Sequence, residues 1–254
     1  LLQRTGLHDS APQSERKETV MKQYMVDAFT DKVFSGNPAA VCVLERWPDE
    51  SLMKSIALEN NLSETAFVVK EPSGYHLRWF TPKDEINLCG HATLATAFVI
   101  LNYYDKAADT VEFNTMSGKL AVTRKGDLYE MDFPTYEIKE VPVTDEMEKA
   151  FGVRPVKAFL SMDLICVFGN GDEVSAMRPD QALLERLPGR IQNATSRGTA
   201  TDCVTRSFAP KCGVAEDPVC GSAHCQVADY WSKVLGKDDI VAYQASARGG
   251  TLYC

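Results

Sequence analysis

The chain has 254 residues, 44% hydrophobic and 24% charged, which is an ordinary globular composition with room for two domains. A formal net charge of −8 excludes a basic surface for nucleic acid or an anionic membrane. The longest apolar run, residues 95–101, is far shorter than the roughly 18 residues that span a bilayer. Residues 1–20 are polar and patternless, so we expect a leader or an added segment before Met21.

The first half, residues 21–135, is predicted to wrap strands around a helix. An amphipathic helix is expected over residues 49–60, with Leu52 and Ile56 on its buried face. A second helix, residues 90–104, is apolar on almost every side, so a curved sheet should enclose it. The predicted strands are residues 24–30, 39–44, 65–69, 75–80, 111–114, 119–124 and 128–133.

The second half is residues 136–254. Its first residues belong to a segment, residues 134–142, that is expected to cross from one half to the other. Helices are expected over residues 145–151, 179–186 and 222–235, and Gly236 ends the last one. Residues 189–199 are polar and are predicted as a loop. The predicted strands are residues 156–160, 164–168, 202–208, 240–243 and 251–254, and because the last strand has no closing element we expect further residues beyond it.

One segment occurs twice in the chain. Residues 80–98 begin Phe-Thr-Pro-Lys and reach Cys-Gly-His-Ala, and residues 208–225 begin Phe-Ala-Pro-Lys and reach Cys-Gly-Ser-Ala. The two starts are 128 positions apart, which indicates a duplicated domain. Each copy predicts a helix beginning at Gly90 or Gly221, where free N–H groups and a positive dipole end suit a carboxylate. Two facing helix starts would form one anion-binding cleft.

Eight cysteines without a Cys-x-x-Cys pair argue against a disulfide framework, so we expect a reduced, cytoplasmic protein. Cys42, Cys166 and Cys203 lie in apolar strand-like contexts and are predicted to be buried thiols. A second group, of three cysteines and one histidine, could be considered as a zinc site. The spacing of these residues does not match structural zinc sites, so we predict no metal. That group is Cys212, Cys220, Cys225 and His224.

Separated motifs, in the order of the family, resemble the phenazine-biosynthesis PhzF-like family from about Met21 onward. They are Asp27-Ala-Phe-Thr, Ser35-Gly-Asn-Pro-Ala-Ala-Val, Asn61-Leu-Ser-Glu-Thr-Ala-Phe-Val, Phe80-Thr-Pro, Cys89-Gly-His-Ala-Thr and Glu216-Asp-Pro-Val-Cys-Gly-Ser-Ala-His. The resemblance implies an α+β, diaminopimelate epimerase-like fold of two similar domains. Each would be a curved, mostly antiparallel, barrel-like sheet around a central helix. It also implies a homodimer.

In PhzF a glutamate moves a proton between ring carbons without a cofactor. The resemblance puts that glutamate at Glu64, with His91, Asp217 and Ser222 as its partners in catalysis. Gly90 and Gly221 would present N–H groups to a small carboxylated substrate, cyclic or amino-acid-like. Such a proton shift needs a base with a pKa near working pH, and burial raises the pKa of a glutamate.

Two alternatives remain open. Cys89 and Cys220 stand at the Cys-Gly positions where two cysteines act as an acid–base pair in racemases and epimerases of this fold. A helix start favours the thiolate that such a pair needs. The chain could also be a non-catalytic binding protein on the same fold. Considered alone, Glu64 would be a solvated glutamate at a helix end, Asp217 a turn residue, and Ser222 a helix cap.

Overall fold

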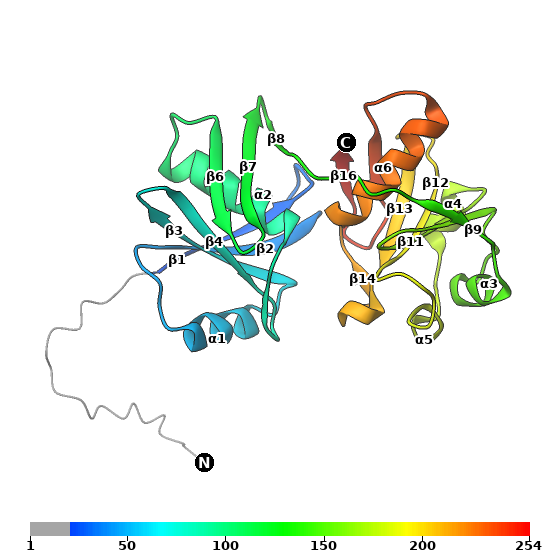
Figure 1. Cartoon of the computed structure of the whole chain (residues 1–254), viewed down its shortest axis with the longest axis horizontal. Helices are drawn as coiled ribbons and strands as arrows, with labels where there is room; N and C mark the ends of the chain where they lie inside the picture. Colours follow the sequence, from blue (N-terminus) through cyan, green and yellow to red (C-terminus); the bar gives the residue numbers. More distant parts are fainter. Residues whose placement is uncertain (1–20) are drawn as a thin grey trace, which may run out of the picture.

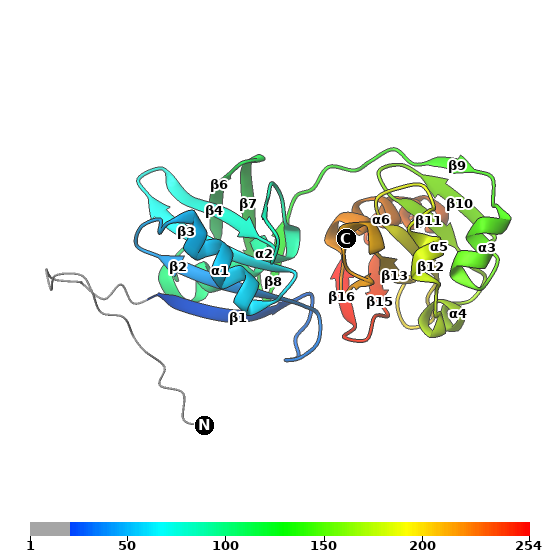
Figure 2. The same cartoon turned by 90° about the horizontal axis from the view of Figure 1, so that it is seen from below.

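The computed structural model describes residues 21–254, which form two similar halves side by side (Figures 1 and 2). Each half has an eight-stranded curved sheet, and a central helix lies against one face of it. The predicted α+β fold is therefore confirmed. The expectation for residues 1–20 lies outside the described residues. The predicted division at residue 135 falls in the segment between the two sheets.

The first sheet has the strand order β1-β2-β3-β4-β6-β7-β8, with β5 paired to β4. Most neighbours are antiparallel, while β2–β3 and β4–β6 are parallel. The strands are β1 (Lys22–Ala28), β2 (Asn37–Leu44), β3 (Glu64–Glu71), β4 (Gly74–Phe80), β5 (Glu85–Ile86), β6 (Thr110–Thr115), β7 (Gly118–Lys125) and β8 (Leu128–Met131).

The second sheet repeats the pattern in the order β16-β15-β13-β12-β11-β10-β9, with β14 paired to β13. Its parallel pairs are β11–β12 and β13–β15. The strands are β9 (Lys139–Val141), β10 (Lys157–Leu160), β11 (Leu164–Val167), β12 (Gln192–Arg197), β13 (Cys203–Phe208), β14 (Glu216–Asp217), β15 (Val241–Gln244) and β16 (Gly250–Tyr253).

The central helices are α2 (Gly90–Val99), which continues as a π-helix over Ile100–Tyr104, and α6 (Gly221–Leu235). Gly236 ends α6 in the left-handed conformation, as predicted. The opposite sheet faces are covered by α1 (Glu50–Asn60) in the first half and by α3 (Asp145–Phe151), α4 (Gly171–Ala176) and α5 (Gln181–Leu184) in the second. The middle strands of each sheet are thus buried on both faces, whereas outer strands such as β1, β7 and β8 keep exposed residues.

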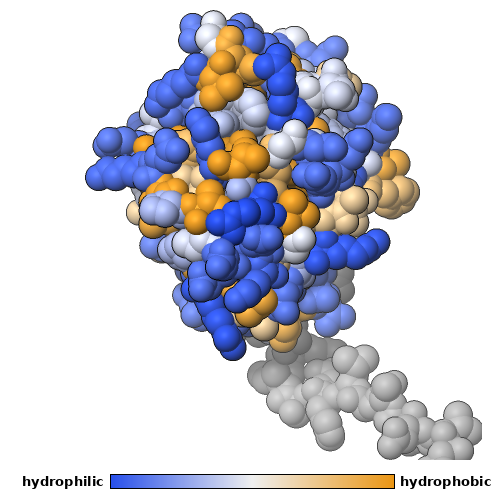
Figure 3. All heavy atoms as spheres, turned by 90° about the vertical axis from the view of Figure 1, so that its right-hand side faces the viewer, coloured by the Kyte–Doolittle hydropathy of each residue, from blue (hydrophilic) through white to orange (hydrophobic). Residues whose placement is uncertain are grey.

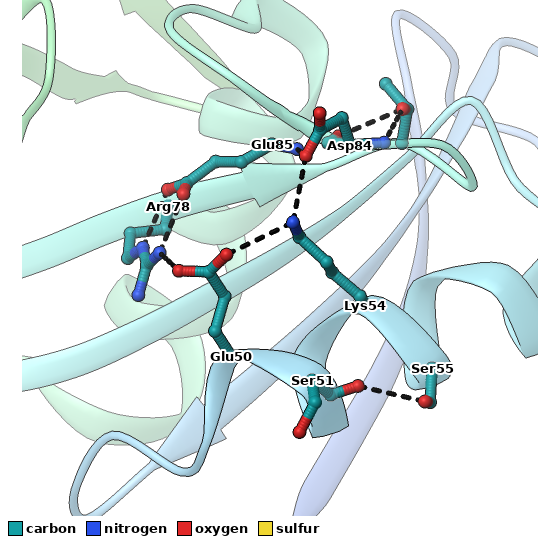
Figure 4. A network of polar contacts seen from close by, with 8 residues as sticks. Glu50, Ser51, Lys54, Ser55, Arg78, Asp84 and Glu85 are labelled. Carbon is teal, nitrogen blue, oxygen red and sulfur yellow. Dashed lines mark hydrogen bonds and ion pairs between the residues drawn. The ribbon is translucent and has the colours of Figure 1, made fainter.

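Strand register shows which residues of the two halves are equivalent. Phe80 pairs with Thr65, and its repeat counterpart Phe208 pairs with Gln192. Counting back one residue makes Glu64 the counterpart of Ile191. An arginine–glutamate pair is also duplicated: Arg78 binds Glu85 beside Phe80, as Arg206 binds Glu216 beside Phe208. In the first half, Arg78 also binds Glu50 of α1, and Lys54 of α1 binds Asp84 just before β5, so α1 is joined to the sheet (Figure 4).

The two halves are joined by backbone hydrogen bonds where the β15–β16 hairpin meets the loop after β1. Gly36 N–H donates to Gly249 O at 2.7 Å, and Thr251 N–H donates to Phe29 O at 2.9 Å. Gly36 has φ +66°, and a Cβ there would lie 2.1 Å from Ala28 O. Only glycine fits this junction, because both the conformation and the close approach exclude a side chain.

Several sequence predictions need correction. Residues 189–199 contain the central strand β12 and not only a loop. Leu52 is 48% exposed, and Met53 takes its expected place in the core with Ala57. Phe98 is partly exposed, so α2 is not enclosed on every side. The crossing at 134–142 includes β9, the helix at 179–186 is shorter, and α4 was missed.

The buried polar residues of β12 explain why it resembled a loop. Gln192 donates to Pro188 O and Gly189 O, and Thr195 accepts from the Trp231 indole at 2.9 Å. Buried polar side chains are tolerated in a core when such partners are present. Polar composition alone therefore gave the wrong prediction for this segment.

Hydrophilic residues cover much of the outer end of the second half, with apolar residues in patches between them (Figure 3). No helix among residues 21–254 is long and apolar enough to cross a membrane.

Candidate active site

Most of the predicted site residues lie at strand and helix ends where the two halves meet. Glu64 begins β3, and His91 is in the first turn of α2. Asp217 ends β14, and Ser222 is in the first turn of α6. The starts of α2 and α6 come from equivalent loops, and the two helices contact each other. The loops also touch, since Lys83 Nζ lies 3.2 Å from the position of a Cβ on Gly213.

Glu64 and His91 lie next to each other in the site. His91 Nε2 lies 3.3 Å from Glu64 Oε2, and the two side chains are only 9% and 17% exposed. Neither atom makes a well-aligned hydrogen bond to the described protein. Buried polar atoms without a partner are uncommon and are often found where a ligand or a proton is handled. The pair can therefore accept a further group.

Burial, the largest cause, and the nearby charge of Asp217 together raise the pKa of the Glu64 carboxyl to about 7. A contact with Cys89 opposes this shift in part. Near neutral pH the carboxyl is therefore present in both its acid and its base form. A group that must take a proton and return it needs this property.

His91 is neutral over the same pH range. Burial lowers its pKa to about 4, against a smaller opposing effect of the Pro38 backbone. Its other ring nitrogen, Nδ1, lies 3.4 Å from Cys89 Sγ. A neutral imidazole can donate one hydrogen bond through Nε2–H or Nδ1–H without adding a charge.

Asp217 is held by residues of both halves. Asn37, at the start of β2, donates from Nδ2 to Asp217 Oδ1 at 2.9 Å and to Val219 O at 3.0 Å. Gln244 of β15 donates to Asp217 O at 2.6 Å and accepts from Cys220 N–H at 2.9 Å. Burial is the largest cause of the raised pKa of Asp217. The loop before α6 is thus fixed through its side chain and its backbone.

Ser222 is connected differently from the other predicted residues. Its Oγ accepts from Arg190 Nη2 at 2.9 Å and lies 3.4 Å from Cys220 Sγ. It makes no hydrogen bond to Glu64 among the described residues. The site therefore has a Glu64–His91 side and a Ser222–Arg190 side.

Gly90 and Gly221 are the first residues of α2 and α6, as predicted. An aromatic ring approaches each of them. A Cβ on Gly90 would lie 3.0 Å from Phe133 Cζ, and one on Gly221 would lie 3.4 Å from Phe29 Cζ. A larger residue at position 90 would be crowded by this ring, so packing also favours glycine there.

Cys89 and Cys220 precede these glycines, and both are buried. Burial raises the pKa of each thiol well above its ordinary value. Backbone N–H groups of the first helical turn lower it, but by less. Both groups are therefore neutral thiols at pH 7. Cys42, Cys166 and Cys203 are buried free thiols, as predicted.

One set of metal-ligating atoms is present here. The donor atoms of Glu64, Cys89 and His91 all lie within 4.8 Å of one another. Nitrogen, sulfur and carboxylate donors suit a divalent zinc-like ion. This set differs from the group imagined from the sequence, in which His224 instead contacts Thr205 Oγ1 and Cys220 O.

Sequence reasoning assigned no role to Asn37, Arg190 or Gln244. Asn37 lies in the Ser-Gly-Asn-Pro motif, one of the motifs shared with the family, so that motif was a signal that could have pointed to it. Arg190 lay in the segment predicted as a loop, and Gln244 follows a predicted strand. Their roles depend on contacts between distant segments, for which the local sequence carries no signal.

The sequence and structure were compared with known proteins. Residues 26–254 match the PhzC-PhzF family model, described as phenazine biosynthesis-like protein. An uncharacterized isomerase of Pseudomonas aeruginosa is 49% identical over 91% of this chain and 89% of its own length. The human phenazine biosynthesis-like domain-containing protein is 38% identical, over 90% of this chain and 89% of its own.

Solved structures agree with these matches. A PhzF family protein of Enterococcus faecalis has a TM-score of 0.89 and 50% identity, covering 91% of this chain and 90% of that one. A probable proline racemase of Agrobacterium radiobacter has a TM-score of 0.57 and 10% identity, covering 89% of this chain and 82% of that one. The second likeness shows a shared fold alone.

Proposed function

The chain belongs to the PhzC-PhzF family of phenazine biosynthesis-like proteins, and from this premise we propose that it is a cofactor-independent isomerase. It moves a proton between two carbons of a small carboxylated substrate, cyclic or amino-acid-like. The observation that carries the proposal is the Glu64 carboxyl, buried 3.3 Å from His91 with a pKa raised to about 7. Relatives named uncharacterized isomerase support the reaction class.

In this proposal ionised Glu64 removes a proton from a substrate carbon. The electron pair of the broken C–H bond moves into the π system of the substrate, and Glu64 returns the proton to another carbon. No electron leaves the substrate and no group is lost. A pKa near the working pH allows one carboxyl to serve as base and then as acid.

Negative charge develops on the substrate in the intermediate state and must be stabilised. Neutral His91 can donate a hydrogen bond, and the N–H groups at Gly90 and Gly221 lie at positive helix ends. Asp217 keeps the pKa of Glu64 high, and Asn37 and Gln244 hold Asp217 and its loop. Ser222 is assigned to substrate binding.

The test is exchange of substrate hydrogen for solvent deuterium, followed by proton NMR over a panel of cyclic amino acids and dihydroaromatic acids. Glu64→Gln keeps the shape of the side chain and removes its ionisation, so exchange should fall to background. Glu71→Gln, at the other end of β3, is the matched control and should keep the wild-type rate. Persistent exchange in Glu64→Gln would contradict the role assigned to Glu64.

A second candidate function is a two-cysteine racemase. It is supported by the equivalent positions of Cys89 and Cys220, each directly before the start of a central helix. Under that mechanism Cys89→Ala or Cys220→Ala, and not Glu64→Gln, abolishes exchange. The raised pKa of both thiols weighs against it, because the thiolate is the reactive form. Absence of exchange across the panel would favour a binding protein.

A further inference from the structure

We propose that Arg190, held in place by Asp163 and Gln226, binds the carboxylate of the substrate and so decides which way round the substrate lies between the halves. The inference rests on the proposed function and specifies its substrate binding. The carboxylate lies on the Ser222 side, and the reacting carbon is left beside Glu64. Arg190 would then be a specificity-determining residue.

The anchor of Arg190 is a carboxylate with no exposed surface. Asp163 accepts from Gln226 Nε2 at 3.0 Å, from Ile191 N–H at 3.2 Å, and from Arg190 Nε and Nη2 at 3.2 and 3.4 Å. A buried carboxylate needs several donors to offset its lost hydration. Two of these bonds hold the guanidinium by one edge, so its orientation is set by the core of the second half.

The guanidinium is also connected to the site through Nη2. Nη2 also donates to Ser222 Oγ at 2.9 Å, in the first turn of α6. Nη1 has no hydrogen-bond partner in the described part of the chain, and the side chain is 43% exposed. Its charge acts on Asp217 and Cys220, which places it within electrostatic range of the site. A fixed planar guanidinium is well suited to a carboxylate.

The first half shows that the fold itself does not need this group. Strand register makes Ala39 the counterpart of Asp163 and Ser63 that of Arg190. Counting from the helix starts makes Ala95 the counterpart of Gln226. Small residues thus pack the same place in the first half, which has no arginine there. Buried ionic networks are weak evidence for stability. Stability alone therefore does not explain why the second half has this network in place of small residues.

The two halves would therefore have different tasks. The first half supplies Glu64, whose counterpart in the second half is the buried Ile191. The second half supplies Arg190, whose counterpart is Ser63. A substrate with one carboxylate can then lie in only one productive direction across the pseudo-symmetric site.

Calorimetric binding tests this inference without turnover. The probes are matched pairs of a cyclic carboxylate and its carboxamide, with benzoate and benzamide as the simplest pair. Wild type should prefer the carboxylates. Arg190→Gln should weaken carboxylate binding by roughly tenfold to a hundredfold, the range for a charge-assisted bond, and leave carboxamide binding unchanged. Arg190→Lys should keep part of the preference. Arg154→Gln, from an exposed ion pair on α3, should change neither.

Arg190→Gln leaves Asp163 without its arginine partner and can prevent folding. A triple variant then provides the test. Asp163→Ala with Arg190→Ser and Gln226→Ala copies the residues of the first half. We expect it to fold and to lose the carboxylate preference. A preference kept in the triple variant, equal losses for both members of a probe pair, or no carboxylate preference in wild type would each overturn the inference. Glu64→Gln should abolish deuterium exchange and still prefer carboxylate to carboxamide, so failure of the proposed chemistry is seen separately from failure of this inference.

Discussion

Asn37 of the first half donates to Asp217 of the second half at 2.9 Å, and this bond connects the two sides of the candidate active site. Asn37 is 1% exposed, and its Nδ2 also donates to Val219 O. Asp217 in turn contributes to the raised pKa of Glu64. The ionisation of the proposed catalytic group therefore depends on how the two halves are joined.

Asn37→Ala should lower the free energy of unfolding by about 1–3 kcal/mol, because Asp217 is left buried without its partner. We also expect slower deuterium exchange, since the carboxylate beside Glu64 is no longer held. Urea unfolding and the exchange assay measure the two effects. Asn114→Ala removes a long surface contact to Ser73 and serves as the control. Equal stability of the two variants would contradict the structural role of Asn37.

Asp217→Asn should lower the pKa of Glu64 below its wild-type value of about 7, because the charge of Asp217 is one of its causes. The pKa should stay above the ordinary 4.5, since burial is the larger cause. Carbon-13 NMR titration of labelled glutamate carboxyls measures this directly, and Glu64→Gln identifies the resonance. An unchanged or higher midpoint would show that the two carboxyls do not interact.

Glu64→Gln should become more stable relative to wild type as pH rises. The folded pKa of Glu64 is raised, so between about 4.5 and 7 the native state holds more protons than the unfolded state. Wild type therefore loses roughly 3 kcal/mol of stability through that window, and the neutral glutamine does not. Urea unfolding at pH 4 and pH 8 measures the difference. Glu71→Gln, on the same strand, should follow wild type at both pH values.

Arg248→Ala should weaken the junction between the halves. Its guanidinium donates to Asp27 Oδ1 at 2.6 Å, Gly36 O at 2.8 Å and Ser35 O at 3.0 Å. Loss of these partly buried, charge-assisted bonds should cost about 2–4 kcal/mol in unfolding free energy. Arg154→Ala, from an exposed pair, should cost well under 1 kcal/mol. Similar losses in the two variants would mean that Arg248 does not join the halves.

Thiol labelling separates the two proposed mechanisms. Exposed Cys212 should react with iodoacetamide in the native protein, while Cys89 and Cys220 should react only after unfolding. The pKa of Cys212 is raised too, but Cys212 is exposed, whereas burial both shields Cys89 and Cys220 from the reagent and raises the pKa of each thiol. Mass spectrometry of digests identifies the labelled residues. Rapid native labelling of Cys89 or Cys220 would favour the two-cysteine alternative.

The repeated segment, the two helix starts at Gly90 and Gly221, and the family motifs were all readable in the sequence. These features are local: a glycine, a turn and a periodic apolar run depend on neighbouring residues. The repeat and the two helix starts predicted a duplicated domain with a cleft between the halves, and the resemblance to the family supplied the α+β topology. They also predicted the enclosed helix, although Phe98 proved partly exposed.

Tertiary structure alone decided the electrostatics of that site and the polar strand beside it. The pKa of Glu64 depends on burial and on Asp217, which the fold brings from the other half. Arg190 acquires its orientation from Asp163 and Gln226, on separate elements. β12 is buried despite its polar sequence, and its Thr195 accepts a hydrogen bond from the distant Trp231. Desolvation and pairing between distant segments arise only when the chain is folded, so no local pattern could contain them.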